Sequence, residues 1–375
     1  MNIGIVCYPT HGGSGVVATE LGSALADTGH NVHVISYAMP FRFQAYRHNL
    51  SYHEVEVTAY PLFRYPPYDL ALAGRIMEVV DQYGLDLIHV HYAIPHAVSA
   101  LLAREMLGQD GKNIRIITTL HGTDITIIAQ QKEFQRITAF GIEHSDAVTS
   151  VSDELKGRVL DVLGERKRPI EVIPNFIDTQ RFTPGCCADK RRELAKPDEK
   201  IIMHVSNFRE LKRTREIIHA FAKYSQKQRS RLVMVGDGPD LGACRDLALE
   251  LKLRDRVTFV GTYDAIWELL PQADLFVLAS EYESFGLSAL EAMACGVPTL
   301  TTNAGGLPEV VKEGETGLMF NVGDINALAA AMSRMLGDDA LRAKMGAAAR
   351  ERAVSVFAKE KILPQWHAFY KKVLS

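Results

Sequence analysis

The chain has 375 residues, of which 47% are hydrophobic and 23% charged, which suits a globular protein of two domains. The net charge of -3 gives no reason to expect nucleic acid as a partner, and no apolar run reaches the roughly 18 residues of a membrane span. The N-terminal residues lack the pattern of a secretory leader, and no pair of the five cysteines has C-x-x-C spacing. We therefore expect a cytoplasmic protein with free thiols.

Short apolar strands alternate with helical patterns along the chain. The strands predicted in the first half are Ile3–Cys7, Val32–Ser36, Leu87–Val90, Ile114–Leu120 and Ala147–Val151. Those predicted in the second half are Ile201–Ser206, Arg231–Val235, Val257–Val260, Leu275–Leu278 and Thr299–Leu300. Apolar strands separated by helices indicate parallel sheets covered on both faces. The predicted fold class is therefore α/β, with two doubly wound Rossmann-like domains.

The domain boundary is predicted within residues 170–178, an extended segment. Residues 1–170 are assigned to the first domain and 171–356 to the second. The polar stretch from Gly185 to Glu199 is interpreted as a mobile connection. The last segment, 357–375, is predicted to be an amphipathic helix that packs back onto the first domain. Its apolar side chains at helical spacing are Ile362, Trp366, Phe369, Tyr370 and Val373.

A glycine-rich loop follows the first strand. Residues Gly13 to Ala18, GSGVVA, fit the dinucleotide-binding pattern G-x-G-x-x-G/A. Residues Tyr8 to Gly12 separate this loop from the strand, and the second strand ends in Ser36-Tyr37-Ala38-Met39 without an acidic residue for a ribose, so NAD is disfavoured. Two interpretations stay open: a plain turn before a packed helix, or a loop whose amides approach a bulky anion.

The segment most informative about function follows the predicted strand Leu275–Leu278. It reads SEYESFGLSALEAMACGVP, with Gly286 as a turn and a helix predicted to begin near Leu287. Glu283 lies on the loop and Glu291 about one turn into the helix. The two carboxylates thus flank the free amides of a helix start at the mouth of a parallel sheet. Taken alone, they could equally be two solvated charges.

This segment strongly resembles the E-x7-E signature of the retaining glycosyltransferases of family 4, which have the GT-B fold with a cleft between two domains. The resemblance covers nearly the whole chain. It includes the glycine loop, Val172–Asp178, Ser206–Lys212, Val235–Pro239, Glu283–Glu291 and Asn303–Glu309. It implies that Glu283 contacts the donor sugar and Glu291 the nucleotide ribose. The other donor contacts expected in the second domain are Asn207, Tyr263, Ser284, Phe285, Gly286 and Leu287.

Cleavage of the bond between a sugar C1 and a nucleotide diphosphate builds negative charge on the leaving group, which fixed cations can neutralise without a metal. No two aspartates have D-x-D spacing, and we expect neither a metal nor a cofactor. Lys212 matches the family pattern G-R-x-x-x-x-K, but Ser206-Asn207 replaces its Gly-Arg. Arg209 is therefore predicted as a substitute in a diphosphate clamp with Lys212. The alternative is that Arg209, Lys212 and Arg213 form a solvated basic face.

The family resemblance also assigns residues in the first domain. His121, in TTLHGTD after the strand Ile114–Leu120, is expected to bind the donor sugar near the reaction centre. Gly13, Ser14 and Gly15 are expected to face the diphosphate across the cleft. A single histidine after a strand is more often structural, and the neighbouring HVH motif is not interpreted as a metal site.

Four stretches resemble a narrower group within the family: CYPTHGGSGVVATELG, SYAMPFRF, HVHYAIPHA and TTLHGTDIT. Enzymes of this group transfer N-acetylglucosamine from UDP-N-acetylglucosamine to the hydroxyl of L-malate, the first step of bacillithiol biosynthesis. The resemblance implies these two molecules as substrates. A small dianionic acceptor needs cations or oriented donors. The candidates are Thr10, Arg64, Tyr65, Tyr92 and His96.

Three alternatives remain at this point. The chain could be a family 4 glycosyltransferase with another sugar or acceptor, an NAD-dependent oxidoreductase, or a nucleotide-sugar-binding protein without activity. The presence of Lys212, Glu283, Glu291 and His121 together argues against the last. A homo-oligomer is possible on any of these interpretations.

Overall fold

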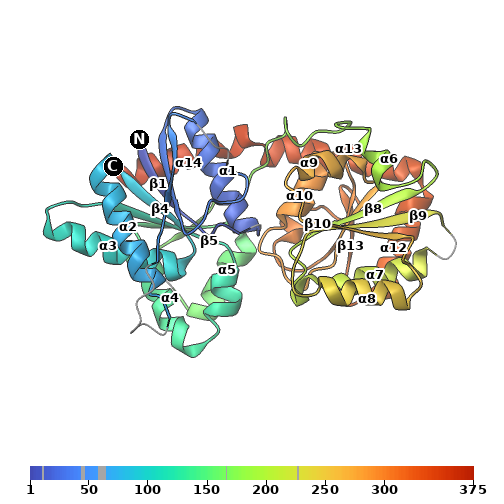
Figure 1. Ribbon diagram of the computed structural model, residues 1–375, viewed down its shortest axis with the longest axis horizontal. Helices are drawn as coiled ribbons and strands as arrows, with labels where there is room; N and C mark the ends of the chain where they lie inside the picture. Colours follow the sequence, from blue (N-terminus) through green and yellow to red (C-terminus); the bar gives the residue numbers. More distant parts are fainter. Residues whose placement is uncertain (11, 44–46, 58–64, 166, 226–227) are drawn as a thin grey trace. The chain divides into compact units, whose positions relative to one another are not determined.

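The computed structural model describes all residues except 11, 44–46, 58–64, 166 and 226–227, and they form two compact units. The first unit comprises Met1–Asn175 and Ile362–Ser375, and the second comprises Phe176–Lys361. In each, helices cover both faces of one parallel sheet (Figure 1). The predicted α/β class with two doubly wound units is confirmed. None of the helices in the described part of the chain has the length and apolar character of a membrane span.

The first unit contains a seven-stranded sheet in the order β3-β2-β1-β4-β5-β6-β7. The strands are β1 (Asn2–Val6), β2 (Asn31–Ser36), β3 (Leu50–Glu54), β4 (Leu87–His91), β5 (Arg115–Leu120), β6 (Ala147–Ser150) and β7 (Ile170–Val172). The α-helices are α1 (Gly13–Asp27), α2 (Tyr68–Tyr83), α3 (Val98–Gln109), α4 (Lys132–His144), α5 (Asp153–Leu163) and α14 (Lys359–Leu374). Two short π-helical turns, η1 (Ala93–Ala97) and η2 (Asp124–Ile128), follow β4 and β5.

The second unit contains a six-stranded sheet in the order β10-β9-β8-β11-β12-β13. Its strands are β8 (Lys200–Val205), β9 (Ser230–Val235), β10 (Val257–Gly261), β11 (Leu275–Leu278), β12 (Thr299–Thr302) and β13 (Gly317–Phe320). Its helices are α6 (Lys190–Leu194), α7 (Thr214–Tyr224), α8 (Leu241–Glu250), α9 (Ile266–Leu269), α10 (Leu287–Ala294), α11 (Leu307–Val310), α12 (Ile325–Gly337) and α13 (Asp339–Phe357), with 3-10 turns η3 (Glu210–Lys212) and η4 (Leu270–Gln272).

Both sheets have the same topological switch. In the first unit the chain builds outward from β1 to β2 and β3, then returns to place β4 on the other side of β1. In the second unit β8 and β11 have the same relation. Doubly wound proteins bind ligands at the carboxyl ends of the strands beside such a switch, because the flanking loops diverge there. The loops after β1, β4, β8 and β11 are therefore where a ligand is expected.

Burial on both faces explains why most strands could be predicted. Ile3 and Ile5 in β1 and Ile88 and Val90 in β4 are fully buried, so the strands are apolar along their length. The predicted strands are all found within two residues of their expected ends. The edge strand β3, with the sequence LSYHE, was missed because most of its side chains are only half buried and polar.

The C-terminal helix α14 packs on the first unit through one apolar stripe, as predicted (Figure 1). Ile362, Trp366, Phe369 and Tyr370 are buried, and Val373 at the end of the stripe is partly exposed. The units divide a few residues beyond the expected boundaries of 170 and 356. β7 still belongs to the first sheet, and a bridge between Ile177 and Ala358 ties the start and end of the second unit together.

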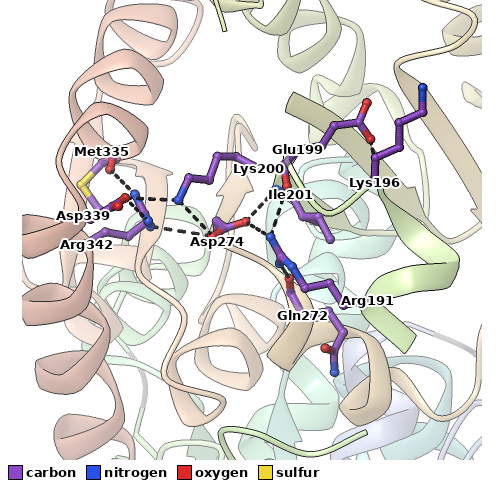
Figure 2. A network of polar contacts seen from close by, with 10 residues as sticks. All are labelled: Arg191, Lys196, Glu199, Lys200, Ile201, Gln272, Asp274, Met335, Asp339 and Arg342. Atoms are coloured by element: carbon purple, nitrogen blue, oxygen red, sulfur yellow. Dashed lines mark hydrogen bonds and ion pairs between the residues drawn. The ribbon is translucent and has the colours of Figure 1, made fainter. Parts of the chain in front are cut away.

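An aspartate anchors the amino end of the second sheet. Asp274, just before β11, accepts a hydrogen bond from the Ile201 backbone N–H at 2.8 Å and donates its own N–H to the Ile201 carbonyl at 2.8 Å. Its carboxylate also pairs with Arg191 at 2.8 Å and lies 3.9 Å from Lys200 and Arg342 (Figure 2). Arg191 belongs to α6, so the stretch from 185 to 199, interpreted as a mobile connection from its polarity, contains a short helix tied to the second sheet through Asp274.

The first sheet uses the same device twice. Asp86 before β4 and Asp146 before β6 each accept the backbone N–H of a residue on the neighbouring strand, Asn2 and Ile116, at 2.8 Å. Each also donates its own N–H to that residue's carbonyl at 2.8 Å. These reciprocal pairs fasten the amino ends of adjacent strands. They leave the carboxyl ends, where the loops carry polar side chains, to the functional site.

Candidate functional site

A partly buried ion pair marks the switch point of the second sheet. Lys212, in η3 after β8, lies with its Nζ 2.6 Å from Oε1 of Glu283, in the loop after β11. The two side chains are 17% and 14% exposed. Ser280 donates a hydrogen bond to the same carboxylate oxygen at 2.7 Å. Two residues predicted to act on one ligand, 71 positions apart in the chain, are thus brought together.

The segment Asn303–Glu309 holds the backbone of Glu283. Gly306 donates its N–H to the Glu283 carbonyl at 2.7 Å. Gly305 has a φ of 61°, and a Cβ there would lie 2.1 Å from the same carbonyl oxygen. Only glycine allows this approach, both for its positive φ and for the space. The position of the Glu283 side chain therefore depends on a turn that no local pattern around Glu283 specifies.

Helix α10 begins at Leu287, as predicted, after Gly286 in the left-handed conformation at φ 97°. The N-cap residue Gly286 has no side chain to cap the first turn, and amides at such a helix start suit an anion. Glu291 lies in the second turn and is only 4% exposed. Together with Lys212, this helix start places positive charge beside the Glu283 loop.

The turn after β8 is shaped by contacts with the turn after β9. A Cβ on Gly236 or Gly238 would lie 1.9 Å from the carbonyl oxygen of Ser206 or Asn207, respectively. His204 receives a hydrogen bond on Nε2 from the Ser206 hydroxyl at 2.7 Å, and burial lowers its pKa to about 4. The Asn207 side-chain oxygen is buried and has no hydrogen-bond partner among the described residues.

Two other predicted donor residues are less closely tied to the ion pair. The Arg209 side chain is exposed and makes no ion pair with the described residues, while its carbonyl accepts the Lys212 N–H at 2.8 Å. Arg213 pairs instead with Glu216 at 2.5 Å and Glu281 at 3.1 Å. Tyr263 follows β10 and donates its hydroxyl to Glu268 at 2.7 Å. The structure therefore brings Lys212, but not Arg209, to Glu283.

The glycine loop and the loop after β4 meet at the switch point of the first sheet. Tyr92 donates its hydroxyl to Ser14 Oγ at 2.9 Å. Helix α1 begins at Gly13, and a Cβ on Gly15 would lie 2.6 Å from the Thr10 carbonyl oxygen and 2.7 Å from that of Tyr8. Close packing of the loop on the strand end thus explains the second glycine.

His121 follows β5 and lies beside this contact, with its ring 5.5 Å from that of Tyr92. Its Nε2 is 2.8 Å from Nδ1 of His91, and its side chain is 8% exposed. Burial lowers the pKa of His121 to about 3 and that of His91 well below its ordinary value. Both imidazoles are therefore neutral near pH 7. Within the described ranges, no three His, Cys, Asp or Glu side chains could together hold a metal ion.

The candidate acceptor residues are only partly gathered here. His96 donates from Nδ1 to the His91 carbonyl at 2.6 Å and keeps a buried Nε2 without a partner in the described chain. Its ring lies 4.4 Å from that of Tyr8 at an angle of 49°. Thr10 is exposed in the glycine loop, and Tyr65 is 75% exposed. Arg64 lies outside the described residues.

Asp124, which was not predicted as a site residue, holds two loops of this site together. Its carboxylate accepts the backbone N–H of Ala93 at 3.2 Å and of Gly122 at 3.0 Å, so it joins the loops after β4 and β5. Burial raises its pKa to about 6. The stretch HGTD contained the residue, but only the fold shows that its side chain turns inward to the backbone.

Two family models match the chain: "Glycosyltransferase Family 4" over residues 11–181 and "Glycosyl transferases group 1" over residues 188–352. The chain is 44% identical to the N-acetyl-alpha-D-glucosaminyl L-malate synthase of Bacillus anthracis, over 100% of this chain and 97% of that protein. The chain belongs to the family 4 glycosyltransferases. A more distant relative is the D-inositol 3-phosphate glycosyltransferase of Corynebacterium efficiens, 30% identical over 76% of this chain and 71% of that protein.

Solved structures agree with this family. A sucrose-phosphate synthase from Thermosynechococcus elongatus is 27% identical with a TM-score of 0.82, over 100% of this chain and 99% of that one. Anabaena HepE in complex with UDP-glucose has a TM-score of 0.85 at 21% identity, over 99% of this chain and 100% of that one, a likeness of fold alone. This family 4 member is thus a GT-B hexosyltransferase.

Proposed function

We propose that this glycosyltransferase moves N-acetylglucosamine from UDP-N-acetylglucosamine to the hydroxyl of L-malate with retention, as the first step of bacillithiol biosynthesis in the cytoplasm. The similarity that carries this proposal is the 44% identity to an N-acetyl-alpha-D-glucosaminyl L-malate synthase along the whole chain. The free state of all five cysteines fits the proposed location.

The donor is assigned to the second unit. Lys212 and the first amides of α10 would carry the charge that develops on the diphosphate as its bond to C1 breaks. Glu283 would accept hydrogen bonds from sugar hydroxyls, and Glu291 from the ribose. The supporting geometry is the 2.6 Å contact between Lys212 and Glu283, which places a cation and a hydroxyl acceptor side by side. No metal is required by this arrangement, since the positive charge comes from the chain itself.

The acceptor is assigned to the first unit. L-Malate offers two carboxylates and one hydroxyl, and the hydroxyls of Ser14 and Tyr92 are donors that suit such an anion. His121 would donate a hydrogen bond to the sugar. The new bond forms between C1 and the malate hydroxyl oxygen, the bond between C1 and the diphosphate oxygen breaks, and the hydroxyl proton passes to the departing phosphate.

An acceptor panel tests this proposal. UDP release from UDP-N-acetylglucosamine is measured with L-malate, D-malate, other 2-hydroxy acids, inositol 3-phosphate and no acceptor. We expect release to depend on L-malate and to exceed the acceptor-free rate by at least about 100-fold, since a site built around substrate polar groups discriminates strongly against analogues. Release that depends on inositol phosphate instead would assign a different acceptor within the family. UDP binding without release would indicate a protein without activity.

A further inference from the structure

A column of stacked histidines runs through the first unit to His121. The rings of His89 and His91 lie 4.5 Å apart at 30°, and those of His91 and His121 lie 5.0 Å apart at 22°. His89 is fixed at its two nitrogens by Tyr370 at 2.8 Å and Thr119 at 2.6 Å. His91 is fully buried and reaches His121 through Nδ1. This packing leaves His91 little freedom to turn its ring.

The contact between His91 and His121 can hold only one proton. Burial strongly disfavours the charged form of both rings, so each is a neutral imidazole with one N–H and one lone pair. Either His91 Nδ1 donates to His121 Nε2, or His121 Nε2 donates to His91 Nδ1. The first arrangement puts the His121 proton on Nδ1, and the second leaves a lone pair there.

The opposite nitrogen of His91 decides between the two arrangements. His91 Nε2 is buried and has no hydrogen-bond partner within the described structure. If it carried the proton, a buried N–H donor would be orphaned, which is rarer in proteins than an unsatisfied acceptor. The favoured arrangement therefore leaves a lone pair on His91 Nε2 and puts the proton on His91 Nδ1, where His121 Nε2 accepts it.

The other nitrogen of His121 is the one available to a ligand. Nδ1 makes no hydrogen bond to any described residue and is not among the buried polar atoms without a partner. The side chain keeps 8% of its surface exposed. An N–H at this position can donate to a sugar hydroxyl oxygen, whereas a lone pair there could only accept.

We infer that His91 is a positioning residue, which holds His121 in the Nδ1–H tautomer so that His121 offers a donor to the bound sugar nucleotide. This inference rests on the proposed sugar contact of His121. His91 itself is buried behind His121 and touches no substrate. The HVH motif was not interpreted as a metal site from the sequence, and its second histidine, His91, is here given a positioning role.

The tautomer is measured directly by long-range nitrogen–proton NMR on full-length protein with ¹⁵N-labelled histidine. His121→Ala identifies the His121 signals. In the parent protein we expect a protonated-type Nδ1 and an unprotonated-type Nε2 for His121. His91→Asn places an amide donor near the position of the lost Nδ1–H and should keep that pattern. His91→Phe removes the donor and should shift His121 toward a mixture of tautomers.

Turnover of UDP-N-acetylglucosamine is measured on the same variants. His91→Phe should lower kcat by about 10-fold, the effect of losing one hydrogen bond in the transition state, with KM for L-malate little changed. His91→Asn should recover most of that loss. His89→Phe is the matched control, because it removes a stacked histidine that does not bond to His121; the His121 tautomer should stay as in the parent.

Several results would overturn the inference. A proton on His121 Nε2 in the parent protein contradicts it directly, whatever the activities are. An unchanged His121 pattern in folded His91→Phe means that another group sets the tautomer. If His91→Phe fails to fold, folded His91→Asn gives the test instead: loss of the parent His121 tautomer in that variant would also overturn the inference. Full turnover by His121→Ala would instead remove the proposed sugar contact, while the NMR result would stand by itself.

Discussion

Lys212 and Glu283 form a 2.6 Å ion pair between two loops that follow neighbouring strands, β8 and β11. The pair keeps a cation and a carboxylate in register at the switch point of the second sheet. Each partner is less than a fifth exposed, so removal of one charge leaves the other poorly solvated. Under the proposed function, a diphosphate in this site would compete with Glu283 for Lys212, and the carboxylate would then be free to bind sugar hydroxyls.

The first prediction concerns Glu283→Gln. The amide keeps the shape of the side chain but loses the charge, so we expect kcat to fall by about 100- to 1000-fold, as for other preorganised electrostatic groups. Tm should decrease as well, because Lys212 loses its charged partner. Steady-state kinetics and thermal melts check both. The matched control is Glu281→Gln, whose 61% exposed carboxylate pairs with Arg213 outside the proposed site and should keep turnover within about twofold. Equal activities of the two variants would contradict the role of Glu283.

The turn that holds Glu283 gives a second prediction. Gly305→Ala should lower both stability and turnover, because the new Cβ would meet the Glu283 carbonyl at 2.1 Å and push the loop away. Gly314→Ala is the control, since Gly314 also has a positive φ, 74°, but open space around the added Cβ. In both variants, backbone strain should lower the free energy of unfolding by roughly 1 kcal/mol. Only Gly305→Ala should lose turnover as well. A loss of activity of the same size in both variants would show that distant strain, rather than displacement of Glu283, is responsible.

A third prediction concerns which glycine of the loop is required for close packing. Gly15→Ala should destabilise the first unit, since a Cβ would lie 2.6 and 2.7 Å from two backbone oxygens. Gly13→Ala has nothing within 4 Å of the added Cβ and should keep the parent stability. Urea unfolding curves give the comparison. If both variants are equally stable, the loop adapts to a side chain and the observed close packing is not required.

The buried histidines predict acid sensitivity of the first unit. Burial lowers the pKa of His89 and His121 to about 3 and of His96 to about 4, and that of His91 is also lowered. Below the unfolded value of about 6.5, the unfolded chain takes up protons that the folded unit refuses, so the free energy of unfolding decreases as pH falls. Asp124 has the opposite effect below its pKa of about 6, but it is a single group, whereas burial also lowers the pKa of His33 and lowers that of His53 to about 4.

The expected slope is about 1.4 kcal/mol per pH unit for each such histidine once the pH is well below 6.5. Denaturant unfolding at about pH 7.5 and about pH 5, followed by a probe in the first unit, measures it. In the variant His96→Gln residue 96 cannot titrate, so the slope of the free energy of unfolding against pH should be smaller by the contribution of one histidine. Equal midpoints at the two pH values would mean that the four histidines are not buried as neutral rings.

The sequence could predict most of the fold because its strands are buried on both faces. Val34, Val90 and Val277 belong to short apolar runs, which are typical of strands buried on both faces. Three strands were missed: the short strand β7, the polar edge strand β3, and β13, whose sequence GLMF is apolar but only four residues long. The polarity of 185–199 was misleading for a different reason: the charge of Arg191 is neutralised by Asp274, a partner distant in the chain (Figure 2).

The candidate site could be predicted where its residues lie together in one sequence motif. Glu283, Gly286 and Glu291 lie in one signature, and the helix start at Leu287 follows from the glycine before it. The contact of Lys212 with Glu283 depends on the order of β8 and β11 in the sheet, which no local pattern encodes. Arg209 was chosen for its nearness in sequence, and its side chain does not reach the ion pair.

The most direct test is mass spectrometry of the product formed from UDP-N-acetylglucosamine and L-malate by the purified full-length protein. The account predicts one new species with the mass of N-acetylglucosaminyl malate, formed with stoichiometric UDP and strongly reduced with Glu283→Gln. Free N-acetylglucosamine as the only sugar product, or a malate adduct formed equally well by Glu283→Gln, would contradict it.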